Sequence, residues 1–67
     1  MDNAGIRQAQ MTIETYRQLH KGENPKSDMV TSYFLDNVFY ELRYYSQNRQ
    51  WRLTEYKKTE EVVINDT

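Results

Sequence analysis

Cations and aromatic rings are interleaved over residues 43–58, and this segment points most directly to binding chemistry. Such groups can neutralise phosphates and stack on bases, but the same residue types are enriched where proteins bind one another. A helix with aromatic core positions and solvated cations is the purely structural alternative. The residues are Arg43, Tyr44, Tyr45, Arg49, Trp51, Arg52, Tyr56, Lys57 and Lys58.

Other side chains capable of chemistry are scattered along the chain. There is no cysteine, and no Ser-His-Asp or Glu-His spacing surrounds His20. General acid–base catalysis needs carboxylates held together with divergent pKa values, and nothing places two acids together in an apolar pocket. We therefore predict no catalytic residue, no metal site and no cofactor, and a protein that is not an enzyme.

The length of the chain limits how it can be stabilised. Its 67 residues make a single domain over residues 1–67, and a chain of this size buries only about 60% of the surface that its unfolded form exposes. Disulfides, a metal or self-association usually supplement so small a core. Because the chain has no cysteine and one histidine, we expect it to self-associate as a homodimer.

Charge and hydropathy narrow the choice of partner and compartment. The formal net charge of −1 is typical neither of a globally basic nucleic-acid binder nor of a strongly acidic nucleic-acid mimic. The opening MDNAGIRQAQ lacks the pattern of a secretory signal, and no apolar run approaches the roughly 18 residues of a membrane span. We therefore predict a cytoplasmic protein that does not contact a membrane.

A first helix is predicted over residues 3–21, with Asp2 or Asn3 as its N-cap. Apolar residues recur there at spacings of three and four: Ile6, Ala9, Ile13, Tyr16 and Leu19. Gly22 and Pro25 end this helix, because glycine accepts a left-handed backbone and proline cannot prolong a helix. Residues 22–26 then form a short connector, which makes the flanking elements antiparallel neighbours.

The second element is predicted to be one long helix over residues 27–57. At about 100° per residue, one stripe forms a core and comprises Val30, Phe34, Val38, Leu42 and Tyr45. A second stripe gathers Met29, Tyr33, Tyr40, Tyr44 and Trp51. A first helix of about 18 residues covers only roughly half of the second helix. The second stripe therefore stays exposed, and an exposed apolar patch usually marks an association site.

A β-hairpin is the competing interpretation, since Val, Phe, Tyr, Trp and Thr favour strands. Residues 38–45 and 51–56 alternate in character around a turn at 47–50, and residues 61–64 would add a third strand. Neither glycine nor proline marks that turn, and we therefore favour the long helix. Residues 58–67 are then expected to form a mobile acidic tail.

The sequence thus predicts a mainly α fold, an antiparallel helical hairpin with a short first helix and a long second helix. The alternative is an α+β fold with an N-terminal helix or helices and a C-terminal β-hairpin. The predicted function is that of a small regulator, inhibitor or adaptor that binds another protein, of a size typical of phage and other mobile-element proteins. The alternative function is a nucleic-acid-binding regulator that uses residues 43–58. A small-molecule substrate is not expected. The predicted partner-binding residues are Tyr33, Tyr40, Tyr44, Trp51, Arg43, Arg49 and Arg52.

Overall fold

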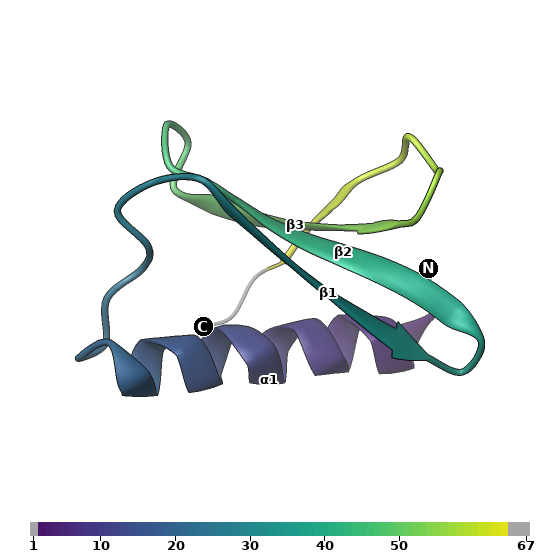
Figure 1. Ribbon diagram of the computed structural model, residues 1–67, viewed down its shortest axis with the longest axis horizontal. Coiled ribbons are helices and arrows are strands. Elements are labelled where there is room, and N and C mark those ends of the chain that lie inside the picture. The colour runs from purple at the N-terminus through teal and green to yellow at the C-terminus, as the bar shows by residue number, and fades with distance from the viewer. Residues whose placement is uncertain (1, 65–67) are drawn as a thin grey trace.

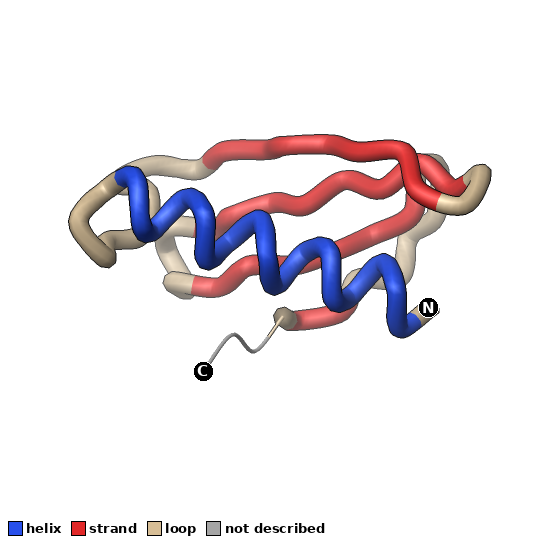
Figure 2. The backbone as a smooth tube through the Cα atoms, turned by 90° about the horizontal axis from the view of Figure 1, so that it is seen from below, coloured by secondary structure: helices blue, strands red, loops and turns tan. Residues whose placement is uncertain are grey.

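A computed structural model describes residues 2–64 of the chain. One helix, α1 (Asn3–Leu19), is followed by an antiparallel sheet of β1 (Met29–Leu35), β2 (Val38–Tyr45), β3 (Gln50–Glu55) and β4 (Val62–Val63). The strands lie in chain order, β1-β2-β3-β4. The helix lies across one face of the sheet (Figure 1, Figure 2). We call this covered face the inner face and the opposite one the outer face.

The long helix predicted for residues 27–57 is wrong, and the helical hairpin is wrong with it. Most of these residues belong to β1, β2 and β3, so the fold is α+β, which was the alternative interpretation. The physical reason is the high content of β-branched and aromatic residues. Their side chains lose rotamer freedom in a helix but pack well on a pleated surface.

Two tight turns interrupt what was predicted to be helix. Asp36 and Asn37 join β1 to β2 with φ values of 51° and 64°, and two successive left-handed residues are what a two-residue type I′ hairpin requires. Asp and Asn adopt this conformation more readily than other non-glycine residues. In the turn between β2 and β3, Arg49 has a φ of 55°. Both hairpins therefore form without glycine.

The first helix was predicted over residues 3–21, and α1 spans Asn3–Leu19 in the structure. Asp2 is its N-cap, and the Asp2 carboxylate accepts a hydrogen bond from the Ala4 amide at 3.1 Å. At the other end, the Gly22 amide donates to the Arg17 carbonyl at 2.7 Å. Lys21 and Gly22 are both left-handed, with φ values of 58° and 80°. This is a Schellman-type ending, in which the backbone of the connector satisfies a carbonyl of the last helical turn.

The core lies between α1 and the inner face of the sheet. Ala9 and Ile13 of the helix are fully buried. The sheet side of the core comes mainly from β2 and β3, with one residue that follows β4: Tyr40, Leu42, Tyr44, Trp51, Leu53 and Ile64.

The C-terminal segment takes part in the sheet. Residues 58–67 were predicted to be a mobile tail, but Val62 and Val63 form β4 and pair with Leu53 and Arg52 of β3. The amide of Ile64 donates to the carbonyl of Trp51 at 2.9 Å. Residues 65–67 of the predicted tail lie outside the described residues.

The absence of a side chain at Gly5 lets α1 approach the sheet closely. A Cβ atom at this position would lie 2.5 Å from Cζ of Tyr40. The hydroxyl of Tyr33 donates a hydrogen bond to the Gly5 carbonyl at 2.7 Å. Two tyrosines of neighbouring strands therefore meet the helix at its first turns.

Candidate functional site

The aromatic residues predicted to form an exposed face belong to the inner face instead. Tyr40, Tyr44 and Trp51 have exposed fractions of only 2%, 3% and 3%, and Tyr33 is half-buried. Residues two apart in a strand share a face, so Tyr40 and Tyr44 lie beside Leu42 in the core. These side chains do not have the exposure on which their predicted role in partner binding was based.

The predicted arginines lie apart from these aromatic residues. Arg43 and Arg52 alternate with core residues along their strands, and they are directly opposite each other in the β2–β3 register. Arg49 is exposed in the turn between the two strands. The structure therefore brings Arg43 and Arg52 together on the outer face, and the sheet separates them from the buried tyrosines and tryptophan.

A carboxylate holds each of the two outer-face guanidinium groups. Nη2 of Arg43 lies 3.3 Å from Oε2 of Glu41, and Nη1 of Arg52 lies 3.3 Å from Oε1 of Glu61. Arg52 also donates from Nη2 to Oε1 of Gln50 at 3.0 Å. Like charges directly opposite each other destabilise a sheet. The two carboxylates offset this repulsion, and the four charges cancel.

Tyr45 extends this polar cluster. The guanidinium carbon of Arg52 lies 4.3 Å from the centroid of the Tyr45 ring, and the Tyr45 hydroxyl donates to Oε2 of Glu61 at 2.6 Å. The hydrogen bond from Tyr45 is the main cause that lowers the pKa of the Glu61 carboxyl. The same bond raises the pKa of the Tyr45 hydroxyl. Glu61 therefore stays ionised between a guanidinium and a phenol.

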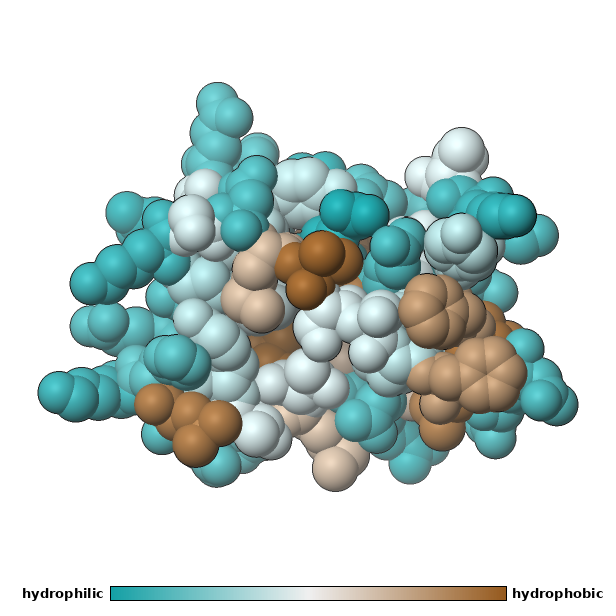
Figure 3. Space-filling model, viewed as in Figure 1, coloured by the Kyte–Doolittle hydropathy of each residue, from teal (hydrophilic) through white to brown (hydrophobic). Residues whose placement is uncertain are grey.

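A second set of aromatic side chains lies on the outer face, near the turn between β1 and β2. Phe34 and Phe39 are cross-strand partners, and the rings of Phe39 and Tyr56 meet edge to face, 5.4 Å apart at 86°. Phe34, Phe39 and Tyr56 are 66%, 39% and 52% exposed. We call these three residues the aromatic patch. Figure 3 shows hydrophobic atoms gathered at the end of the molecule where Figure 1 has this turn.

The aromatic patch was missed in the sequence because Phe34 was assigned to a helical core stripe. The signal that would have found it is the pair Asp36-Asn37. A two-residue turn at this pair makes Leu35 and Val38 partners. It then places Phe34 opposite Phe39 on one face, since side chains alternate along each strand.

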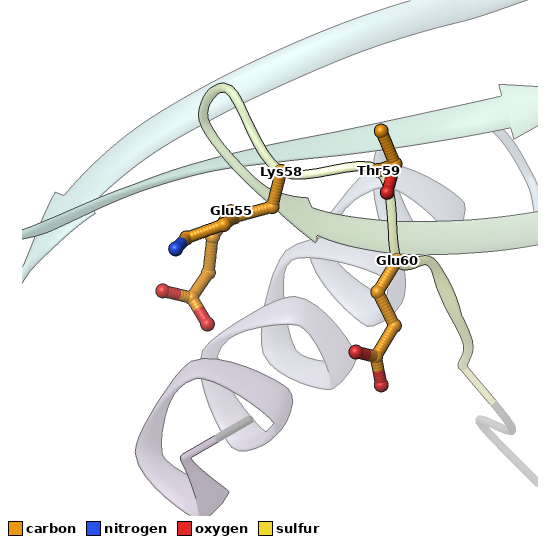
Figure 4. Close-up of a pocket in the computed structure, with 4 residues that line it drawn as sticks. All are labelled: Glu55, Lys58, Thr59 and Glu60. Atoms are coloured by element: carbon orange, nitrogen blue, oxygen red, sulfur yellow. The ribbon is translucent and has the colours of Figure 1, made fainter.

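A hollow of about 310 Å³ lies beside the loop between β3 and β4. Its lining is polar and charged: Glu55, Lys58, Thr59 and Glu60. In Figure 4, Glu55 and Lys58 lie together on one side, and Glu60 extends separately from the loop. The hydroxyl of Thr54 donates to the Glu60 carbonyl at 2.8 Å and anchors the loop on β3. The lining contains no side chain that pairs a nucleophile with a base.

The remaining candidate chemistry is sparse within residues 2–64. In this part of the chain, no group of three or more His, Cys, Asp or Glu side chains is placed to hold a metal ion. The ring of His20 stacks on Tyr16, with centroids 4.0 Å apart. A search for membrane spans over the described residues finds no helix with the necessary length and apolar character.

Comparison with protein-family models, curated proteins and solved structures finds no match to this chain. A proposal about function therefore rests on the geometry of the outer face.

Proposed function

We propose that this protein is a non-catalytic module that binds another protein through the outer face of its sheet. The observation that carries the proposal is the exposure of large apolar side chains on the face that α1 does not cover. They are Val30, Phe34, Phe39, Tyr56 and Val63. Single exposed apolar residues are ordinary on protein surfaces, but a group of them on one face usually marks an association site.

The arrangement of these side chains supports a continuous binding surface. Phe34, Phe39 and Tyr56 form one end of it as the aromatic patch. At the other end, one cross-strand row contains the two arginines between two valines, in the order Val30, Arg43, Arg52 and Val63. Aromatic residues and arginine are enriched at protein interfaces, where a few of them carry most of the binding energy.

The charges favour a protein partner over nucleic acid. A nucleic-acid surface gains affinity when cations replace the counterions of phosphates. On the outer face, however, Arg43 and Arg52 are already paired with Glu41 and Glu61. The expected partner therefore offers an apolar surface to the aromatic patch and neutral polar groups to the arginine row.

The test uses Phe39→Ser and Tyr56→Ser, with Leu19→Ser as the matched control. Leu19 is 77% exposed at the end of α1, so the control also removes an exposed apolar side chain, but from the helix. The wild-type protein is cross-linked in an extract of its source cells, and the bound protein is identified and purified. Calorimetry then compares the four chains for this partner, and circular dichroism checks that all four fold.

We expect Leu19→Ser to bind like the wild type and each outer-face variant to lose at least about tenfold in affinity, as hot-spot truncations do. Equal affinity of all four chains would remove the outer face as the binding surface. Recovery of nucleic acid, with an affinity that falls steeply as salt rises, would support the nucleic-acid alternative instead. The cytoplasmic location, the mobile-element origin and the lack of enzymatic activity stay predictions from the sequence.

A further inference from the structure

The free edge of β1 is a feature that the proposed function does not use. Among the strands of residues 2–64, β1 has only β2 beside it, and Figure 2 shows it at the margin of the sheet. Its seven residues, MVTSYFL, include no charge and no proline. Proteins usually protect sheet edges with charges, prolines, bulges or very short strands. β4, at the opposite edge, has only two residues, whereas β1 is long and unprotected.

The first hairpin determines which backbone groups of β1 are free. Leu35 and Val38 flank a two-residue turn, so they form a hydrogen-bonded pair, and the next pair, Phe34 and Phe39, does not bond across the two strands. The Phe39 carbonyl instead accepts from the Tyr56 amide on the β3 side, at 2.8 Å. Phe34 therefore directs its N–H and C=O away from β2.

The same alternation applies to every second residue of the strand. Val30, Ser32 and Phe34 all direct their N–H and C=O groups toward the free edge. Ser32 is the middle one of the three, so this edge can pair with itself. In an antiparallel pair of identical strands centred on Ser32, each outward-facing residue meets another outward-facing residue.

We propose that β1 pairs with β1 of a second copy of this chain. Ser32 faces Ser32 of the second copy across a two-fold axis, and Val30 faces Phe34 on either side. Each of these pairs exchanges two backbone hydrogen bonds. The two sheets become one continuous sheet with both helices on one face and both outer faces on the other. A closed two-fold pairing of this kind uses the same strand twice and leaves no free β1 edge.

The burial of β1 supports a second copy as the occupant. The side chains of β1 that point to the inner face are only half-buried: Met29, Thr31, Tyr33 and Leu35. Those of β2 on the same face are buried: Tyr40, Leu42 and Tyr44. The core is therefore open on the β1 side. A neighbouring strand would cover that side, and a chain of 67 residues gains from such a supplement to its core.

The first test removes the central hydrogen bonds. Sedimentation equilibrium over a range of concentrations should give the wild type a mass of twice 8.2 kDa. Ser32→Pro removes an N–H that points to solvent in the single chain, so the monomer tolerates it as edge strands do. It should weaken dimerisation at least about tenfold. The two-fold axis places the proline in both copies, so both central hydrogen bonds are lost. The control is Thr15→Lys, on the exposed side of α1. Thr15→Pro is not used, because proline would disrupt the helix.

The second test fixes the register by charge. Ser32→Lys and Ser32→Asp should each weaken dimerisation at least about fivefold, because like charges would face each other across the axis. An equal mixture of the two variants should form a heterodimer, because opposite charges then face each other. This rescue depends on Ser32 meeting Ser32, and it works even if the proline variant fails to fold.

Three results would overturn the proposal: a wild type that stays monomeric at every concentration, a dimer that Ser32→Pro leaves intact while folded, or charge variants that fail to associate when mixed. None of these variants changes Phe39 or Tyr56. The pairing of β1 and the binding of a partner by the aromatic patch can therefore fail independently.

Discussion

Replacing Gly5 by alanine tests whether α1 lies directly on β2. The new Cβ atom would lie 2.5 Å, 2.6 Å and 2.7 Å from Cζ, Oη and Cε1 of Tyr40. Carbon atoms in a packed core are separated by about 3.5–4.0 Å, so either the helix or the ring has to move by about 1 Å. Tyr40 is buried with an exposed fraction of 2%, and its ring has little room to yield.

Two effects of Gly5→Ala oppose each other. Alanine favours a helix over glycine by roughly 0.5–1 kcal/mol, whereas overpacking a core costs typically about 1–3 kcal/mol. A shift of the helix also disturbs the 2.7 Å hydrogen bond from the Tyr33 hydroxyl to the Gly5 carbonyl, which contributes about 1 kcal/mol. The expected net loss is about 1–3 kcal/mol, or roughly 4–8 °C in Tm for each kcal/mol in a domain of this size.

Urea and thermal unfolding, followed by circular dichroism, measure this loss. Ala4→Gly in the same helical turn is the control for helix propensity, and we expect it to cost no more than about 1 kcal/mol. Adding Tyr40→Leu to Gly5→Ala should recover part of the overpacking cost, which a double-mutant cycle detects. A Gly5→Ala chain that is more stable than the wild type would refute the close packing of α1 on the sheet. That gain is also what a helical hairpin would show.

Other variants probe the core, one hydrogen bond and one carboxylate. Trp51→Ala should cost about 3–5 kcal/mol in the free energy of unfolding, because it empties a fully packed core site; unchanged stability in urea would contradict its burial. Burial raises the pKa of Tyr33 to about 12 from 10.0, so the stability from its neutral form is complete below pH 10 and is lost as pH rises through 12. Tyr33→Phe should lower the free energy of unfolding by about 1 kcal/mol at neutral pH. The variant should also lose less stability than the wild type as pH rises from 10 to 12. Alkaline melting curves identical to those of the wild type would contradict this prediction. The amide and hydroxyl of Ser46 both donate to Asp28 at 2.7 Å and lower its pKa below 3.8. Stability from Asp28 is therefore present above pH 3.8 and is lost as pH falls through the lowered pKa, and an unshifted NMR titration of this carboxyl would show that the bonds do not form in solution.

The first helix could be predicted from the sequence because its signals are local. The apolar spacing of Ile6, Ala9 and Ile13 and the capping residue Asp2 are features of one short stretch, and the structure has α1 at this place. Leu19 is the exception within the predicted stripe, since it is exposed at the end of the helix. The part of the apolar stripe that packs on the sheet therefore ends one turn before Leu19.

The sheet could not be predicted in the same way, because its pairing depends on residues far apart. The apolar residues persist at helical spacing, and the turn proposed over residues 47–50 has neither glycine nor proline, so the long helix was favoured over strands. In the structure, Arg49 takes a left-handed conformation in that turn, and a second turn that was not predicted forms at Asp36 and Asn37. At Arg49, turn geometry imposed by the two paired strands therefore outweighs local turn preference, whereas Asp36-Asn37 is itself a local turn signal.

Because a helical period was applied to residues that form strands, the predicted core and the predicted surface were exchanged. A helical wheel grouped Val30 and Phe34 with Leu42 as core, but in a strand they alternate with the inner-face residues and are exposed. Trp51 and Tyr44, predicted to be exposed, are buried as cross-strand neighbours. The list of binding residues changes accordingly.

Both the helical hairpin and the α+β fold leave one face of the second layer uncovered, because both have only two layers. Residues 2–64 contain one helix, of 17 residues, and one helix can cover only one side of its neighbour. An outer face that only met water would be expected to carry polar residues throughout, like the cross-strand pair of Ser32 and Glu41. The cross-strand partners Phe34 and Phe39 instead leave two apolar rings 66% and 39% exposed on the same face. That contrast within a single face is the strongest reason to expect a partner there.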